Sequence, residues 1–370
     1  MKYGLSTCCA LLMAFVNVAA MAQNDSEKEG PFTFNASYIG DFVGNAGGGI
    51  KDGAGYLGYG GIGVNFCTEA AGWWKGGEFV LSGATTHGAT PSITLTGDYQ
   101  AADNIEAGDY FMLQSLYYSQ TLGNVQIMGG LLDYPSLHAY TDAALLYLNS
   151  SFGYNALLGY SYGIAVFPMT AWALNVEWGI TDWLTWQTGV FDVPYSFDDN
   201  PHNIRWAFTK EKGAVVSSEF VFGTSFGDGL EGSYRLGAIY QTAMECYELH
   251  ATLEQMFWKG NNRSLTAFAM AAYEPQKINE NYANFAAGIN LNGVFSKKGN
   301  DVMGLAFTTV LFDNEYEQET AIELTYKYAF SERFYLQPDL QYIINPAGME
   351  YSGEKGKNTF FMALRFGIEF

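Results

Sequence analysis

The C-terminal segment Asn358–Phe370 alternates between two kinds of side chain, and this alternation restricts the folds open to the chain more than any other feature. Large apolar residues occupy every second position and would share one face of an extended strand. This face carries Phe360, Met362, Leu364, Phe366, Ile368 and Phe370. The opposite face carries Phe361, Ala363, Arg365, Gly367 and Glu369. The segment therefore predicts a β-strand with an apolar face that can meet lipid and a charged face that needs water.

The same alternation recurs upstream. Four further segments show it: Trp172–Ile180, Tyr247–Trp258, Thr320–Phe330 and Phe334–Ile344. Clusters of Gly, Asn and Asp separate such runs, and examples are Phe226–Gly229, Lys259–Asn262, Lys297–Asp301 and Asp313–Glu315. Short clusters of this kind suit tight turns, and longer ones suit exposed loops. The chain is therefore predicted to form successive antiparallel strands.

The first 22 residues have the features of a secretory signal peptide. Lys2 supplies a positive start, Leu11–Val18 lies in an apolar stretch, and Ala20–Ala22 resembles a cleavage signal. The apolar stretch is shorter than the ~20 residues of a membrane-spanning helix. The mature chain should begin at Gln23, and its polar residues 23–31 should be flexible.

The remaining residues favour a membrane barrel over a helical membrane protein or a soluble protein. No later apolar run is long enough for a membrane helix. Charged residues make up 15% of the chain, against ~25% in a typical globular protein, and aromatic residues make up 16%. The mature length of 370 − 22 = 348 residues allows ~14–18 strands, with about 16 expected. We predict an all-β fold, a transmembrane antiparallel β-barrel with long extracellular loops, formed as one domain by residues 23–370.

The acidic composition argues against a nucleic-acid partner. Removal of Lys2 leaves 18 − 1 = 17 basic residues against 38 acidic ones, a net charge of 17 − 38 = −21. Nucleic-acid binding relies on a basic surface. The negative charge indicates either a solvated acidic surface or a pore that disfavours anions. Cys67 and Cys246, the two mature cysteines, could form a disulfide in an oxidising compartment, but unpaired packing residues are the favoured prediction.

Several short motifs, in order along residues 40–370, give the chain a family resemblance. They include Gly72–Phe79, Thr86–Gly88, Gly97–Gln100, Tyr117–Gln120, Leu146–Gly153, Gly189–Asp192 and Gln337–Pro346. Together with the final strand, they resemble the carbohydrate-selective porins of the OprB type. Segment Gln126–Asp133 departs from the family because it lacks the basic residue that members often carry there.

The resemblance implies an outer-membrane porin of a Gram-negative bacterium. Its partners would be outer-membrane lipid and small carbohydrates that diffuse passively through a water-filled pore. It would not be an enzyme and would need no cofactor or metal. Both a monomer and a trimer remain open.

Polar residues on the non-lipid faces are the candidates for pore lining and solute contact, although a structural role in a charge network of the lumen is the more common one for any single residue. The candidates are Asn175, Glu177, Arg235, Glu248, His250, Glu254, Glu323, Lys327, Arg365 and Glu369. Trp73 and Trp74 could stack on sugar rings or belong to the aromatic girdle at the membrane surface.

Segment Gly88–Asp109 is long, polar and weak in alternation. We expect it to fold partly into the barrel and narrow it. Two other functions are weighed against a porin. An outer-membrane lipase or protease could build its site around His250, with Glu248 and Glu254 nearby, and a structural or adhesion barrel would have a plugged lumen.

Overall fold

The structure is a computed structural model that describes residues 30–161, 163–196, 199–206, 208–227, 229–276, 278–314, 317–348 and 356–370. The predicted signal peptide and residues 23–29 lie outside the described residues. Gly30 is exposed, and the first strand starts at Phe32.

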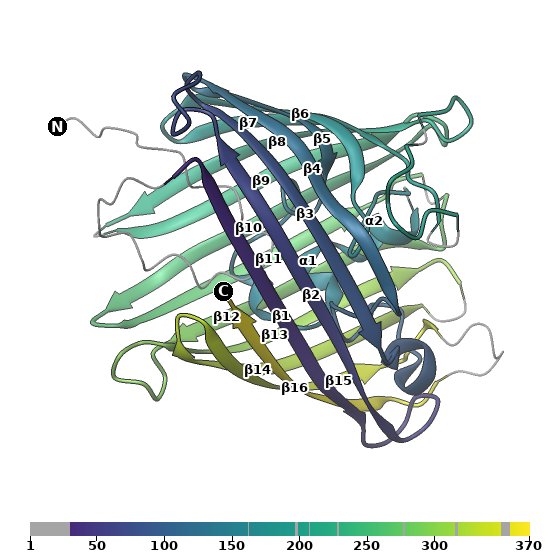
Figure 1. Cartoon of the computed structure of the whole chain (residues 1–370). Coiled ribbons are helices and arrows are strands. Elements are labelled where there is room, and N and C mark those ends of the chain that lie inside the picture. Colours follow the sequence, from purple (N-terminus) through teal and green to yellow (C-terminus); the bar gives the residue numbers. More distant parts are fainter. Residues whose placement is uncertain are drawn as a thin grey trace.

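Sixteen antiparallel strands form a closed barrel, in which each strand pairs with its neighbours in sequence and β1 pairs with β16 (Figure 1). The strands are β1 Phe32–Asn45, β2 Gly53–Cys67, β3 Gly77–Gly88, β4 Tyr110–Leu122, β5 Val125–Leu132, β6 Ala171–Thr181, β7 Leu184–Asp192, β8 Ala214–Phe226, β9 Leu230–Gln241, β10 Cys246–Gly260, β11 Arg263–Tyr273, β12 Asn281–Asn292, β13 Asp301–Phe312, β14 Gln318–Ser331, β15 Phe334–Ile344 and β16 Thr359–Glu369. The predicted fold class and strand number are confirmed.

The two ends of the barrel differ in their connections. At the end where β1 begins and β16 ends, β4–β5, β6–β7, β10–β11 and β14–β15 are joined by tight turns. At the other end, residues 89–109, 133–170 and 193–213 form long loops. Outer-membrane barrels keep short turns on the periplasmic side and long loops outside the cell. We therefore name these the periplasmic and extracellular ends.

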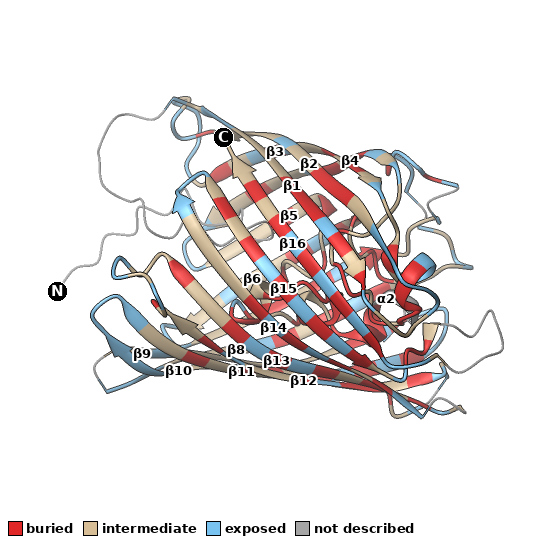
Figure 2. Cartoon of the chain, turned by 90° about the horizontal axis from the view of Figure 1, so that it is seen from below, coloured by how far each residue is buried: buried red, intermediate tan, exposed pale blue. Residues whose placement is uncertain are grey.

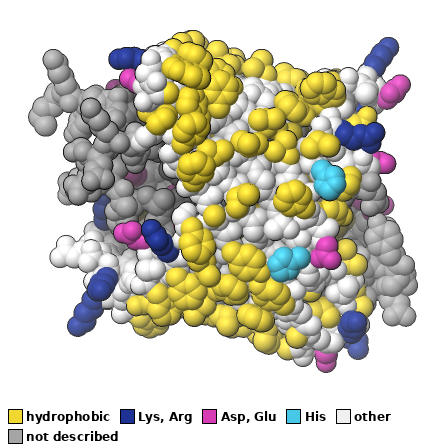
Figure 3. Space-filling view, viewed as in Figure 1, with side chains coloured by type: hydrophobic (Ala, Val, Ile, Leu, Met, Phe, Trp, Pro, Cys, Tyr) yellow, Lys and Arg dark blue, Asp and Glu magenta, His cyan; other side chains and the backbone are white. Residues whose placement is uncertain are grey.

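The alternation in sequence becomes alternation between the two faces of the wall. Figure 2 shows it as exposed and buried bands along β13–β16. In β16, Phe360 and Leu364 are exposed on the outside, whereas Phe361 and Arg365 are buried inside. Figure 3 shows apolar side chains along the wall and charged side chains near its two ends. The predicted lipid-facing and inward faces are therefore confirmed for this strand.

Loops pack into the barrel and give it apolar cores. Short elements interrupt them: η2 Ser92–Thr96, η3 Ala144–Leu146, α1 Ser150–Gly153 and α2 Ala156–Ser161. Tyr147 and Phe152 of loop 133–170 pack against Phe268 of β11. Phe361 joins Ala102 and Ile105 of loop 89–109 in another core. Loop 89–109 covers Phe361, and this explains why an aromatic residue occurs on the inward face of β16.

Two further observations concern the chain as a whole. Among the described residues, every helix is too short or too polar to cross a membrane. Cys67 ends β2 at the periplasmic end and Cys246 begins β10 at the extracellular end, so these two described cysteines do not form a disulfide with each other.

Candidate functional site

Loop 89–109 lies against the inner wall of β14–β16. Glu319 of β14 accepts hydrogen bonds from the backbone N–H groups of Tyr99 at 2.7 Å and Gln100 at 3.0 Å. Gln341 of β15 donates its side-chain amide to the carbonyl oxygen of Ala102 at 2.7 Å. These contacts place the centre of the loop inside the barrel, as predicted for Gly88–Asp109.

Arg365 of β16 ties the same loop to β1. Its guanidinium holds Asp41 through Nε at 3.0 Å and Nη2 at 2.7 Å. Nη2 also reaches Asn104 Oδ1 at 2.7 Å and Asp103 Oδ1 at 3.3 Å. The Arg365 guanidinium and the Asp41 carboxylate are both buried, so each charge needs the other to offset its loss of water. This cluster fixes the position of residues 103–104 in the lumen.

Loop 133–170 is held by carboxylates on three strands. Glu219 of β8 accepts from Ala139 N at 2.9 Å. Glu254 of β10 accepts from Ala143 N at 2.8 Å and from the Thr141 hydroxyl. Glu323 of β14 accepts from Leu148 N at 2.5 Å and Asn149 N at 3.0 Å. A carboxylate has several acceptor sites, so one glutamate can satisfy two donors of a loop that leaves the regular sheet.

A buried charge network surrounds Glu219. Arg235 donates to it at 2.9 Å, Gln187 at 2.6 Å, and His250 Nε2 lies 3.0 Å away. The Arg235 guanidinium also lies 3.9 Å above the ring of Tyr140. The network therefore joins β7, β8, β9 and β10 to the loop at Tyr140.

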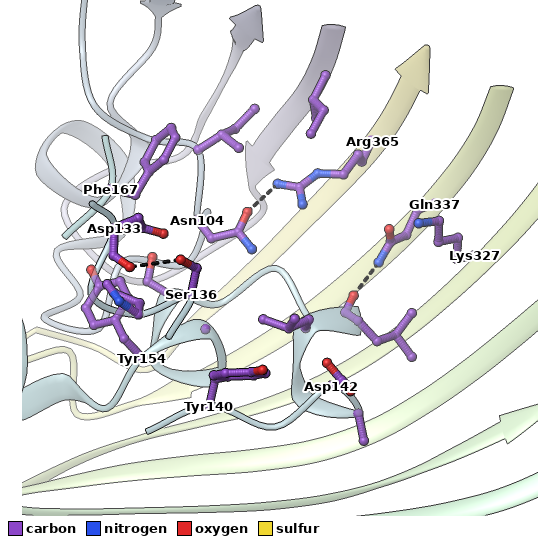
Figure 4. Close-up of a pocket in the computed structure, with 18 of the residues that line it drawn as sticks. Asn104, Asp133, Ser136, Tyr140, Asp142, Tyr154, Phe167, Lys327, Gln337 and Arg365 are labelled. Carbon is purple, nitrogen blue, oxygen red and sulfur yellow. Dashed lines mark hydrogen bonds between the residues drawn. The ribbon is translucent and has the colours of Figure 1, made fainter. Parts of the chain in front are cut away.

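Two adjoining cavities remain inside the barrel. The larger has about 390 Å³ and the smaller about 280 Å³. Four residues line both: Gln114, Asp133, Ser136 and Tyr140. Figure 4 shows Tyr140, Asp142, Lys327 and Arg365 around the larger cavity. The shared residues lie between the two cavities.

Burial changes the titration of groups in the loops. It raises the pKa of Asp133 to about 7 and lowers the pKa of His138 to about 4. Burial, together with the negative charge of Asp98, raises the pKa of Glu106 to about 8. Each shift favours the neutral form, as expected when a group loses water without a full counter-charge.

Comparison with known families assigns the chain. The sequence profile described as carbohydrate-selective porin, OprB family, matches residues 51–246 and 245–370. The chain belongs to the OprB family. It is thus a carbohydrate-selective porin of the Gram-negative outer membrane, a channel rather than an enzyme.

Solved structures share the fold of this OprB-family porin. A high-pH structure of Pseudomonas putida OprB has a TM-score of 0.80 and 20% identity, over 92% of this chain and 94% of that one. A low-pH structure of the same protein has a TM-score of 0.62 and 18% identity, over 92% and 93%. The trimer form of Vibrio cholerae OmpT has a TM-score of 0.52 and 10% identity, over 92% and 99%. A comparison with curated proteins found no significant match.

The ten polar residues predicted for the pore wall of the OprB-family porin all lie on the inner side, in two settings. Glu254, Lys327 and Arg365 line the larger cavity, and Glu369 lines the smaller one. The others form charge networks or hold loop 133–170: Asn175, Glu177, Arg235, Glu248, His250 and Glu323. Contact of any of them with solute stays a prediction.

The residues of the alternative enzyme site, His250, Glu248 and Glu254, are buried or bonded to loop 133–170. His250 Nδ1 lies 3.5 Å from Glu248, and Asn155 donates to Glu248 at 3.0 Å. Glu254, by contrast, is occupied by the loop at Thr141 and Ala143. Membership of the OprB family decides for a channel over this alternative and over a structural barrel.

Trp73 and Trp74 lie in the β2–β3 turn at the periplasmic end. Both are exposed, Trp73 packs edge-on against Phe66, and Trp74 Nε1 donates to Tyr118 at 2.8 Å. Phe66 and Tyr118 also line a hollow on the outside of the wall. This position supports the girdle interpretation, and we do not include the two tryptophans in the proposed pore.

Sequence reasoning missed important inner residues. Asp41, Glu219 and Glu319 lie at inward positions of their strands and could have been found by the same alternation. The loop residues Asp133 and Tyr140 gave no such signal, because their position depends on how loop 133–170 folds back into the barrel.

Proposed function

We propose that carbohydrates cross the outer membrane by diffusing through the two adjoining cavities, and that Gln114, Asp133, Ser136 and Tyr140 form the narrow passage between them. The observation that supports this proposal is that these four residues line both cavities. The passage has a strand side, Gln114 of β4, and a loop side, the other three residues.

The chemistry of the lining suits sugars. Hydroxyl groups bind carboxylates and amides, and the C–H faces of a sugar ring can lie against aromatic rings. The larger cavity offers Asp142 and Lys327 for hydroxyls, and Tyr140 and Tyr154 for ring faces. Individual groups of this kind bind weakly enough to release the solute again, which conduction requires.

Cysteine modification at Ser136 tests the passage. Ser136→Cys would be made in a background with Cys67→Ala and Cys246→Ala, and treated with a bulky thiol reagent in a planar bilayer. We expect the modification to reduce both ion current and glucose flux. Ser331→Cys, exposed at the end of β14, is the control and should be unaffected. Modification of Ser136→Cys that leaves current and flux unchanged would show that the solute takes another route.

The outer wall indicates the remaining partners. Its exposed apolar side chains, such as Leu174, Leu253 and Leu340, make membrane lipid the expected surroundings. Trimer formation is supported only by fold likeness to the trimeric form of Vibrio cholerae OmpT. The mass of the purified protein in detergent distinguishes a monomer from a trimer.

A further inference from the structure

Loop 193–213 completes the barrel wall beside β4. Pairing of β4 with β5 begins only at Leu116, which leaves the extracellular part of β4 without β5. His202 takes this place: its carbonyl oxygen accepts from Leu113 N at 3.1 Å, and its Nδ1 lies 2.8 Å from Phe111 O. The Asn203 side chain donates to Leu113 O at 3.2 Å. The loop is therefore anchored to the edge of a membrane strand.

The loop carries large apolar side chains on the outer surface of the wall. Trp172 of β6 shares the outward face with the exposed Leu174. Trp206 packs against Trp172 with a centroid distance of 5.5 Å and a near-perpendicular ring. Ile204, Trp206 and Phe208 are 64%, 68% and 57% exposed. These side chains extend the lipid-facing surface of the wall beside β6.

Trp172 also joins two hollows on this surface. One, of about 350 Å³, lies over Gly129 and Gly130, with Leu116 among its walls. The other, of about 620 Å³, lies against Trp206 and Phe208. The indole Nε1 of Trp172 is buried and has no hydrogen-bond partner within the protein. The two hollows lie side by side at Trp172, on the lipid-facing surface of the wall.

The second half of the loop carries more positive than negative charge, whereas Asp198 and Asp199 belong to its first half. Between residues 204 and 212 it carries Arg205, Lys210 and Lys212 against the single acid Glu211. Arg205 and Lys210 are exposed, although Arg205 Nη1 donates to the carbonyl of Asp199 at 2.8 Å; Lys212 is half-buried and donates to the carbonyl of Pro194 at 2.9 Å. Two exposed cations therefore flank the exposed apolar side chains.

We propose that this surface, Trp172 with Ile204–Trp206, Phe208 and Lys210, binds an anionic, phosphorylated glycolipid of the outer leaflet. An acyl chain fills the hollows, because the hydrocarbon region offers no water to fill them. Trp172 and Trp206 pack against the acyl chain, and Arg205 and Lys210 hold the phosphate. Charge complementarity selects an anionic lipid over a neutral one. A second copy of this acidic chain is the competing occupant.

Native mass spectrometry of the mature protein in detergent tests the proposal, with diphosphoryl lipid A and phosphatidylethanolamine as competing probes. We expect lipid A to be retained preferentially. Arg205→Ala with Lys210→Ala should lower its retention by about fivefold for each cation removed, as expected for cations at a membrane surface. Trp206→Ala should lower retention of both lipids. Lys297→Ala with Lys298→Ala, at the periplasmic end, is the matched control and should change nothing.

Equal retention of lipid A by the Arg205/Lys210 and control variants would overturn the proposal. The proposal would also be overturned if Trp206→Ala abolished an oligomer but still retained lipid A. That result would show that a second copy of the chain occupies the surface. A second measurement uses the wild-type protein and so does not depend on the folding of a variant. Lipid A with brominated acyl chains should quench tryptophan fluorescence more than brominated phosphatidylethanolamine, and equal quenching would contradict the proposal.

Discussion

At the scale of single residues, wall carboxylates determine how the interior loops are held. Glu219, Glu254 and Glu323 each accept backbone N–H groups of loop 133–170. Alternation in the sequence predicted that Glu254 and Glu323 point inward. It could not predict their partners, because the donors are backbone groups of a loop whose path the strand pattern does not encode.

Removal of one such carboxylate should loosen the passage. Glu254→Ala leaves the Ala143 N–H and the Thr141 hydroxyl without their acceptor. We expect the free energy of unfolding to fall by about 1–3 kcal/mol and the single-channel current to become larger and noisier. Glu254→Gln, which keeps an acceptor oxygen, should have a smaller effect, and Glu231→Ala on the exposed surface none. A quiet, unchanged current in Glu254→Ala would contradict this role.

Glu106 should make the stability of loop 89–109 depend on pH. Its pKa is raised from 4.5 to about 8, chiefly by burial and then by Asp98. Between these values the folded state binds a proton that the unfolded state has released, so the free energy of unfolding falls as pH rises. Glu106→Gln should remove up to about 1.4 kcal/mol of this loss per pH unit. Urea unfolding in micelles at about pH 5 and about pH 8 measures it, and an identical pH dependence in variant and wild type would refute it.

At the scale of elements, strands were predictable and the largest loop was not. The strands Phe334–Ile344 and Trp172–Ile180 match β15 and β6 within a residue, because a membrane wall forces strict alternation. The sequence also placed part of Gly88–Asp109 inside. Loop 133–170 escaped notice because its apolar residues, such as Tyr147 and Phe152, pack into the barrel without a regular period.

Shortening loop 133–170 should widen the pore more than shortening loop 89–109. The first loop crosses the lumen to contact β8, β10 and β14, while the second is bonded chiefly to β14–β16. A variant with residues 138–154 replaced by a short Gly-Ser linker should conduct several times more current, provided that it keeps the heat-modifiable mobility of a folded barrel. Equal currents for the two shortened variants would contradict the larger role of loop 133–170.

At the scale of the whole molecule, the excess of acidic residues has a partial explanation. Some of the carboxylates lie inside the wall, where Asp41 pairs with Arg365 and Glu219 with Arg235. Others, such as Glu319 and Glu323, satisfy backbone donors of the interior loops. The net charge alone could not distinguish carboxylates with these structural roles from carboxylates that make the pore electrically negative, since each carboxylate contributes the same charge.

The central claim is that carbohydrates pass through the interior of this barrel. The most direct test is liposome swelling with the purified mature protein and solutes of increasing size. Glucose and small oligosaccharides should enter protein-containing liposomes faster than empty ones, with the rate falling as the sugar grows. Entry no faster than into empty liposomes would contradict the account.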